Sequence, residues 1–586
     1  MKRSSIKFCC LCILVFGVFL PATITTPIAH AYAPKAASTD FPTVNPDYIY
    51  DQLFYMVTHF QHREAGYGNS GHDAFASYWA QEMLHNLQGF GAQSRQDTFT
   101  VSGWHDRPAT THAFNGEVTV PGGVHPEQVV VIGCHYDGEA FSTQSANDDA
   151  SGCAIELGVA QAMSNYWRSH HVYPARTLRF VIFDAEEQGL YGSFHYLNDT
   201  INGDVQNIVA MFNEEQNGIA YPLRYLGQAA NPLLPFNIEM SPLQNNALYP
   251  AQSKLSSTQQ ENIKHFRALM QQAVVAAFAQ FQALGFQGLT YHDENNEAQA
   301  QPIFTPEQIN NIHQEDDGLG GSDQMPFTLA GLPCATFVGN YSYYDNKPPA
   351  WSYPYDQPQD TIQLMNTFAD GSSQKAHALT LSLALPGMLT TWMLHQPEIL
   401  GETSANTHPF AAISDIGQTL VNKSITVDAR SSFDPEHGTA PLTYAWDFGD
   451  GTTANGSSVN HTYTKTGNYT ITLTARSARG SERMHKNVLV AGQPIVYNNP
   501  YKGYIGDGRP QQNPSVELPQ ANDSLSDQIV NLSSQVTPVA HQMPQKTPSQ
   551  LSSPLNIIAG MLLLLIAIAG GIGIAVRLAR KKTYNT

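Results

Sequence analysis

The sequence predicts an α/β domain with a mostly parallel central sheet flanked by helices, followed by an all-β sandwich and a C-terminal transmembrane helix. Three observations support this architecture. Between residues 40 and 400, short β-branched or aromatic runs alternate with segments of helical apolar periodicity, as in a parallel sheet covered by helices. Between residues 404 and 492, short strand-like runs are separated by turn signals such as Asp450-Gly451. Residues 555–576 form an uninterrupted apolar stretch of about the 20 residues that span a bilayer.

The same patterns place the individual elements. In the first domain we expect strands at residues 98–101, 129–134, 178–183, 208–212 and 335–338, and helices at 45–61, 72–90, 154–167, 193–197, 259–284 and 376–395. An insertion at about residues 219–320 contains one good helical pattern among many Asn, Gln and Pro residues, and we expect it to form the wall of a cleft. In the second domain we expect strands at 424–429, 443–448, 459–463, 468–475 and 485–490.

Both ends of the chain carry the features of an exported and tethered protein. Residues 1–33 combine a basic start, a short apolar core and small residues at a cleavage position, which is typical of a signal peptide. Residues 493–553, rich in Pro, Gln, Ser and Asn, predict a disordered stalk. The tail after the apolar stretch, residues 577–586, is basic, and basic flanks stay in the cytoplasm. We therefore expect a single-pass protein on the extracellular face of the cell membrane. An N-terminal membrane anchor and a buried C-terminal core helix are the alternatives.

The charge and the cysteine content of the chain bear on nucleic-acid binding and on disulfide bonds. The chain has 30 basic and 49 acidic residues and a formal net charge of −19, so we expect no nucleic-acid partner. Three of the six cysteines lie within the signal segment, which leaves Cys134, Cys153 and Cys334. Three cysteines predict no disulfide framework, although one bond between two of them remains open.

Acidic and imidazole side chains follow three of the expected strands. They are His135, Asp137, Asp148, Asp149, Glu186, Glu187, Glu214 and Glu215. The carboxyl ends of parallel strands meet at one edge of a sheet, and buried carboxylates without partners are costly. One nitrogen and several oxygen donors suit Zn²⁺ or Mn²⁺. The adjacent pair Glu186-Glu187 suggests one metal ligand and one free base, which with a metal-activated water can hydrolyse an amide.

The motifs His-Tyr-Asp at 135–137, Ala-Asn-Asp-Asp-Ala-Ser-Gly at 146–152 and Ala-Glu-Glu-Gln-Gly-Leu-Tyr-Gly-Ser at 185–193 resemble the co-catalytic zinc aminopeptidases. That family includes bacterial leucyl aminopeptidase, aminopeptidase Y and the glutaminyl cyclases, and the resemblance covers roughly residues 45–395. It implies a zinc-peptidase, phosphorylase/hydrolase-like fold and two Zn²⁺ ions, with Mn²⁺ or one metal as alternatives. The metal ligands it implies are His135, Asp148 as the bridge, Glu187, Glu215 and Asp356.

The resemblance also implies roles for three further residues. Glu186 is expected to be the general acid and base. Asp137 is expected to hold the second ring nitrogen of His135, and Asp149 to follow a cis peptide bond that aims Asp148.

Three positions depart from the family pattern. Glu215 stands where the family has Asp, with Glu214 as the alternative in register, and Asp356 stands where the family has a His ligand. Gln324 likewise replaces the His of a Ser-Asp-His motif. A site made of Asp148, Glu187 and Asp356 is all oxygen, which favours Mn²⁺, Mg²⁺ or Ca²⁺. Filling of one site only, or an impaired enzyme, is an alternative.

Other polar and aromatic residues are less strong candidates. We expect Asp316 and Asp317 to be solvated loop charges, and His313 is a disfavoured substitute ligand. An aromatic cluster between residues 341 and 355 either lines an apolar pocket or packs under a loop.

The second domain has its own resemblance. The segments Tyr-Ala-Trp-Asp-Phe-Gly-Asp-Gly at 444–451 and His-Thr-Tyr-Thr-Lys-Thr-Gly-Asn-Tyr at 461–469 resemble the signature of the PKD domain, an Ig-like sandwich. The resemblance implies a spacer or a module that contacts protein or polysaccharide.

Together these patterns predict an extracellular, membrane-anchored metallo-aminopeptidase that removes N-terminal residues from peptides or proteins, with Glu186 as general base. One alternative keeps the fold: a glutaminyl-peptide cyclase with one zinc at the positions of Asp148, Glu187 and Asp356. The other is a catalytically impaired surface protein that binds or adheres through its PKD domain.

Overall fold

The computed structural model describes residues 40–493 with gaps, and residues 504–505 and 509–510. The gaps are residues 67, 102–110, 141, 202–204, 220–236, 247, 284–289, 293–297, 301–312, 318–321, 339–356, 371–372, 405–407, 415, 418 and 436–440. The expected signal peptide, most of the stalk, the apolar stretch at 555–576 and the tail therefore lie outside the described residues. So do Asp356 and the aromatic cluster. Within the described part, no helix has the length and apolar character needed to cross a membrane.

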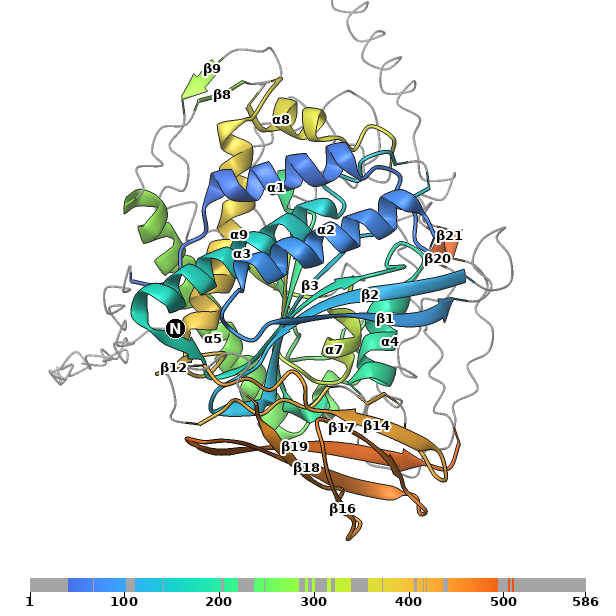
Figure 1. The fold of residues 1–586 in the computed structure, drawn as a ribbon. Coiled ribbons are helices and arrows are strands. Elements are labelled where there is room, and N and C mark those ends of the chain that lie inside the picture. Colours follow the sequence, from blue (N-terminus) through green and yellow to red (C-terminus); the bar gives the residue numbers. More distant parts are fainter. Residues whose placement is uncertain are drawn as a thin grey trace, which may run out of the picture. The chain divides into compact units, whose positions relative to one another are not determined.

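An eight-stranded sheet forms the centre of the α/β domain, in the order β1-β2-β5-β3-β6-β11-β7-β10. Figure 1 labels its strands β1, β2 and β3. Its strands are β1 Gln93–Val101, β2 Thr111–Val120, β3 His125–His135, β5 Arg176–Phe183, β6 Ile208–Glu215, β7 Asn237–Met240, β10 His313–Asp316 and β11 Cys334–Val338. The four central strands β5, β3, β6 and β11 are parallel. The β1–β2, β2–β5 and β11–β7 pairs are antiparallel. The predicted parallel core is confirmed, but the complete sheet is mixed.

The insertion contributes to the sheet itself. Strands β7 and β10 both come from it and pair in parallel with each other, and β7 joins the central strand β11. The insertion therefore supplies two strands of the central sheet, which the sequence did not predict. Each strand has four residues, which is too short for an alternating pattern to stand out in a polar segment.

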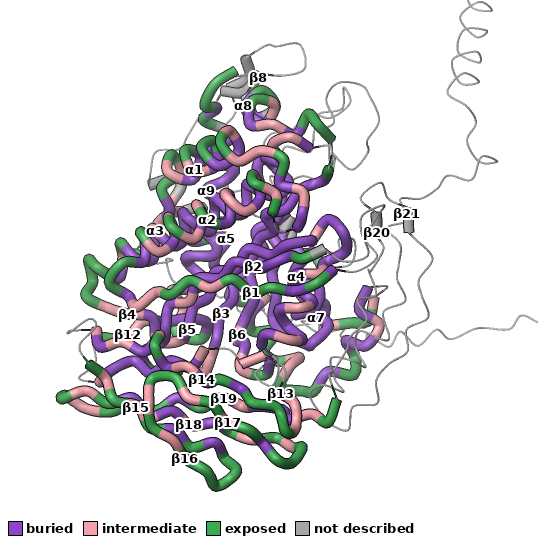
Figure 2. The backbone as a smooth tube through the Cα atoms, turned by 45° about the vertical axis from the view of Figure 1, so that its right-hand side comes forward, coloured by how far each residue is buried: buried purple, intermediate pink, exposed green. Residues whose placement is uncertain are grey.

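Helices cover both faces of the sheet. The long helices are α1 Pro46–His59, α2 Ser70–Asn86, α3 Ala150–His170, α5 Ser257–Ala283 and α9 His377–His395, and α8 Ile362–Asp370 is shorter. Helix α3 packs against β3, β6, α1, α2 and α9. Helices α4 (Tyr191–His195) and α7 (Met325–Leu329) belong to the other face, where Phe327 and Tyr196 pack on Val131 and Phe183. The central strands are buried along almost their whole length (Figure 2), as expected for strands covered on both faces.

Most residues of helix α3 are buried. A Cβ atom at Gly158 would lie 2.4 Å from Ile49 Cγ1 of α1, so only glycine permits this close approach of the two helices. The helix begins after Asp149, whose side chain accepts a hydrogen bond from the Gly152 amide. This N-cap fixes the start of the helix beside the candidate site.

The second domain is the predicted sandwich. Strands β13 Thr419–Leu420, β19 Gly480–Ala491, β18 Gly467–Ser477, β15 Thr443–Asp447 and β16 Thr453–Asn455 form one sheet, and β14 Ser424–Asp428 pairs with β17 Ser458–Thr462. Its core contains Trp446, Phe448, Tyr463, Ile471 and Leu473. Along β18 and the middle of β19, buried residues alternate with residues of intermediate or full exposure, so one face of this sheet is packed and the other is nearer to water.

Candidate metal centre

Three neighbouring strands deliver the polar residues to one edge of the sheet. His135 is the last residue of β3 and Glu215 the last residue of β6, while Glu186 and Glu187 follow β5 after two residues. Strand β3 lies between β5 and β6, and all three are parallel. Their carboxyl ends therefore meet, which is where open α/β sheets place their sites.

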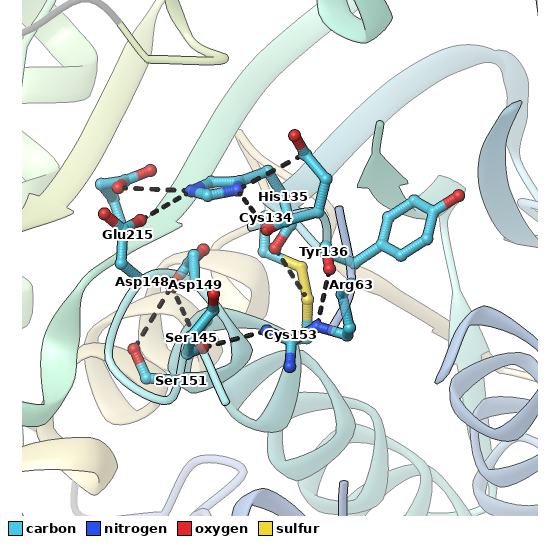
Figure 3. Close-up of a disulfide and its surroundings, with 12 residues drawn as sticks. Arg63, Cys134, His135, Tyr136, Ser145, Asp148, Asp149, Ser151, Cys153 and Glu215 are labelled. Atoms are coloured by element: carbon cyan, nitrogen blue, oxygen red, sulfur yellow. Dashed lines mark hydrogen bonds and ion pairs between the residues drawn. A yellow bond between two sulfur atoms is a disulfide. The ribbon is translucent and has the colours of Figure 1, made fainter. Parts of the chain in front are cut away.

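His135 is the centre of this group (Figure 3). Its Nε2 lies 2.9 Å from Asp148 Oδ1 and 3.7 Å from Glu215 Oε1. Its Nδ1 lies 3.2 Å from the carbonyl oxygen of Asp137 and 3.6 Å from the Asp137 carboxylate. Asp137 thus holds the second nitrogen as expected, but its main-chain oxygen is the nearer partner. Burial opposes a charge on the imidazole, yet the carboxylates of Glu186 and Glu215 raise the pKa of His135 well above its usual value.

Asp148 and Asp149 diverge from a cis peptide bond. Asp148 turns toward His135, whereas Asp149 Oδ1 accepts hydrogen bonds from the amides of Gly152 (2.9 Å) and Gln216 (3.1 Å). Asp360 accepts hydrogen bonds from the amides of Asn147 (2.9 Å) and Asp148 (3.1 Å). The backbone on both sides of Asp148 is therefore fixed, and the predicted cis bond is present.

The two adjacent glutamates are held through their main chain. The Asp137 carboxylate accepts hydrogen bonds from the Glu186 amide (3.2 Å) and the Glu187 amide (3.4 Å). Burial raises the pKa of Glu186 well above its usual value, and the charge of Glu215 adds to this while His135 opposes it.

The structure separates Glu215 from its alternative Glu214, because neighbouring residues of a strand face opposite sides. Glu215 faces His135 and accepts a hydrogen bond from Ser322 Oγ (2.7 Å). Burial raises the pKa of Glu215. The charge of His135 and the hydrogen bonds from His135, Ser322 and Gln216 lower this pKa by more, so the net shift is downward. Glu214 faces helix α9 and accepts a hydrogen bond from Thr390 Oγ1 (2.7 Å).

Two groups of ligand atoms lie close enough to hold an ion. They are His135 with Asp148 and Glu187, and His135 with Asp149 and Glu215, and in each group the atoms lie within 4.8 Å of one another. All five residues are buried. One imidazole and four carboxylates form a donor set that fits a divalent cation such as Zn²⁺ or Mn²⁺. The second group contains Asp149 in place of the bridging Asp148 implied by the sequence resemblance.

Comparison with known proteins agrees with this geometry. Residues 117–302 match the model of Peptidase family M28, and residues 406–491 match that of the PKD domain. The chain carries an M28 domain and a PKD domain. The resemblance to aminopeptidases and glutaminyl cyclase-like zinc peptidases is thereby confirmed, and the β3, β5 and β6 strand ends described above all belong to the M28 domain.

Curated relatives are similar over part of their length. The chain is 30% identical to leupeptin-inactivating enzyme 1 of Streptomyces exfoliatus over 208 residues, which is 36% of this chain and 43% of that protein. It is 32% identical to aminopeptidase YwaD of Bacillus subtilis over 97 residues, 17% of this chain and 20% of that one. The chain thus spans less than half the length of these relatives. A zinc aminopeptidase structure from Bacillus subtilis is 13% identical with a TM-score of 0.38, over 61% of this chain and 96% of that one.

A disulfide bond lies next to His135 and the Asp148-Asp149 pair (Figure 3). It joins Cys134 of β3 to Cys153 in the first turn of α3. Cys134 precedes His135, and Cys153 follows the Asp148-Asp149 pair, so the bond connects the two segments that carry these residues. Cys334 is free and buried, and burial raises the pKa of its thiol to about 12. The sequence left this pairing open.

Two residues of the α/β domain were misjudged or missed by the sequence analysis, Asp317 and Arg63. Asp317 is buried and accepts hydrogen bonds from Tyr249 Oη and Gln324 Nε2, so its prediction as a solvated charge is wrong, while Asp316 is exposed as expected. Arg63 is buried and donates to three carbonyl oxygens of the loop between His135 and Asp148. No local pattern marked it, because its partners lie more than seventy residues away in the sequence.

Proposed function

We propose that this protein is an extracellular, membrane-anchored metallo-aminopeptidase that hydrolyses N-terminal residues from peptides or proteins. The observation that carries the proposal is the pair of buried ligand groups that share His135, one with Asp148 and Glu187 and the other with Asp149 and Glu215. A separate glutamate, Glu186, directly precedes Glu187. The names of two relatives, an aminopeptidase and a leupeptin-inactivating enzyme, support peptide substrates.

His135, Asp148, Glu187 and Glu215 hold the metal in this proposal, joined by Asp356 on sequence grounds alone. A bound divalent ion polarises the scissile carbonyl and lowers the pKa of a water molecule. We propose two Zn²⁺ ions, and Mn²⁺ or a single ion is the outcome that metal analysis distinguishes from it.

Glu186 is the proposed general base and then the general acid. It takes a proton from the attacking water and delivers it to the amine that leaves. A carboxylate held beside the metal ligands can serve in both steps, because it accepts the proton from water and then releases it to the leaving amine. Asp137 holds the backbone of both glutamates and so keeps Glu186 beside the metal ligands.

The proposed location and accessory role rest on the sequence and on one structural feature. The signal-like residues 1–33 and the apolar stretch 555–576 support export and a C-terminal anchor. The Cys134–Cys153 disulfide supports an oxidising compartment. We propose that the PKD domain contacts protein or polysaccharide outside the cell.

The test combines metal analysis with activity on a panel of aminoacyl substrates, with and without added Zn²⁺ or Mn²⁺. Glu186→Gln should lower kcat by about 10²–10⁴-fold with bound metal unchanged. Glu156→Gln is the matched control, because Glu156 is likewise a glutamate whose pKa is raised by burial but lies in helix α3 and is not one of the proposed ligands. It should keep kcat within about threefold.

Each other outcome counts against the proposal. Full activity of Glu186→Gln would remove the mechanism. Pyroglutamyl product from peptides with an N-terminal Gln, without release of amino acids, would identify a cyclase instead. A purified protein that neither contains nor responds to a divalent ion would favour a surface binding protein.

A further inference from the structure

The segment between two of the proposed ligands, residues 136–147, is closed at both ends by one side chain. Arg63 Nε donates to the carbonyl oxygen of Tyr136 (2.8 Å), directly after His135. Its Nη1 and Nη2 donate to the carbonyl oxygens of Gln144 (2.5 Å) and Ser145 (2.9 Å), shortly before Asp148. The guanidinium thus links the point where the loop leaves β3 to the point where it reaches Asp148 (Figure 3).

Arg63 itself has little freedom to move. It is 1% exposed, and its guanidinium carbon lies 4.5 Å from the centre of the Phe75 ring. Its own carbonyl oxygen accepts a hydrogen bond from the Gly138 amide (3.1 Å), and the preceding amide of His62 donates to Thr143 (2.9 Å). Main chain and side chain therefore bind the same loop, and a displacement of either one would lose several hydrogen bonds together.

The charge of Arg63 also fits this place. Burial lowers its pKa to about 10, against the opposing effect of Asp360, Asp137, Asp149 and Asp148, so the guanidinium stays protonated at neutral pH. It is a permanent cation close to a group of carboxylates. Asp360 completes the frame, because it binds the amides of Asn147 and Asp148 on the far side of the loop.

We propose that Arg63 is a positioning residue of the metal centre, which sets the spacing between His135 and Asp148 by holding both ends of the intervening loop. The inference rests on the proposed metal site but not on hydrolysis. An arginine is required because three hydrogen bonds in fixed directions come from one planar group. A lysine has the charge but only a single ammonium nitrogen to reach all three oxygens.

The experiment measures the affinity of the purified full-length protein for zinc alone, by competition with a chromophoric chelator, together with thermal unfolding. Arg63→Lys keeps the positive charge but loses the planar guanidinium group with its several N–H donors. Arg63→Gln loses both the charge and the guanidinium group. Arg179→Lys is the matched control, because Arg179 is a buried arginine of β5 whose Nη1 lies 3.3 Å from Tyr196 Oη and 3.9 Å from Glu117, away from the site.

Both Arg63 variants should bind zinc about 10–100-fold more weakly than the wild type, as expected for residues that orient ligands. Arg179→Lys should lower the melting temperature and leave zinc affinity within about twofold. Equal zinc affinity of wild type and Arg63→Lys would overturn the inference. If Arg63→Gln does not fold, Arg63→Lys alone decides. A wild-type protein that binds no zinc would instead contradict the proposed function, so the two failures are distinguishable.

Discussion

The two domains differ most in what they bury. In the M28 domain, carboxylates such as Asp137, Asp149, Asp184, Glu214 and Asp323 are fully buried at the carboxyl ends of the strands or close to them. Among the described residues of the PKD domain, Asp434 is the one buried carboxylate, and the core consists of aromatic and aliphatic side chains.

The two cores are therefore stabilised by different interactions. Apolar packing stabilises the PKD domain without a proton or an ion, because burial of apolar surface is its main driving force. The buried carboxylates of the M28 domain each cost free energy unless a proton, a hydrogen-bond donor or a cation compensates them. We therefore expect metal removal, disulfide reduction and pH changes to alter the stability of the M28 domain. Large-to-small core substitutions should lower the stability of whichever domain carries them.

Removal of the divalent ion should produce the largest difference. Dialysis against a chelator should lower the proposed aminopeptidase activity by at least about 10³-fold, because the activated water would be lost, and readdition of Zn²⁺ should restore it. Loss of the ion should also accelerate hydrogen exchange of the amides of β3 and β6, because it lowers the free energy needed to open these strands. The expected decrease in that free energy is about 3 kcal/mol if the ion was present at 100 times its Kd. Hydrogen exchange of β18 should not change, and equal acceleration in both domains would contradict the comparison.

The second largest effect should be the loss of stability when a large side chain of the PKD core is replaced by alanine. Trp446 is 2% exposed and its Nε1 donates to the Gly456 carbonyl oxygen (2.9 Å), so Trp446→Ala should destabilise this domain by about 3–5 kcal/mol. Hydrogen exchange in β15 and β18 would measure the loss, while kcat/KM should stay within about twofold. The exposed Arg483→Ala on β19 is the control and should change neither quantity.

Loss of the disulfide should act on the M28 domain alone. Cys134 and Cys153 are 19 residues apart, and a loop of this size corresponds to about 3 kcal/mol of stabilisation. The Cys134→Ser/Cys153→Ser variant should show this loss in urea unfolding, and a reducing agent should reproduce it in the wild type. Cys334→Ser serves as the control, and a similar loss in that variant would show that thiol burial rather than the bond is responsible.

The smallest expected effect is the pH dependence of the unfolding free energy that arises from His195. Burial opposes the charge on His195, but hydrogen bonds to Asp199 (3.0 Å) and Asp97 (3.3 Å) raise its pKa to about 9. The folded state therefore keeps a proton that the unfolded chain loses above pH 6.5, so this contribution is complete below pH 6.5 and disappears as pH rises through 9. Unfolding free energy should fall by at most about 1.4 kcal/mol between pH 7 and 8 from this group. His195→Asn should flatten that slope.

The sequence predicted much of the site because its residues follow strands that are easy to recognise. Val129 to Ile132 are β-branched, and a run of this kind indicates a strand buried on both faces. His135 at its end was therefore expected to meet the residues that follow β5 and β6. The choice between Glu214 and Glu215 could not be made, since a shift of one residue reverses the face on which each side chain lies.

The remaining parts of the site depend on contacts between distant segments. Arg63 meets carbonyl oxygens 73 to 82 residues away, and Asp360 meets amides 212 and 213 residues away. Backbone groups carry no residue identity, so nothing in the sequence marks them as partners. Asp317 was misjudged for a similar reason, because the side chains of Tyr249 and Gln324 that bury it come from two other segments.

The amino-acid sequence by itself determined the order of the domains, the parallel core and the acidic residues at its strand ends, since these depend on local periodicity and on short motifs. Only the tertiary structure decided which carboxylates face His135, which two cysteines pair, and that Arg63 holds the loop between two proposed ligands. The physical reason is that such choices are made by distances between atoms of different segments, and those distances exist only after the sheet has assembled.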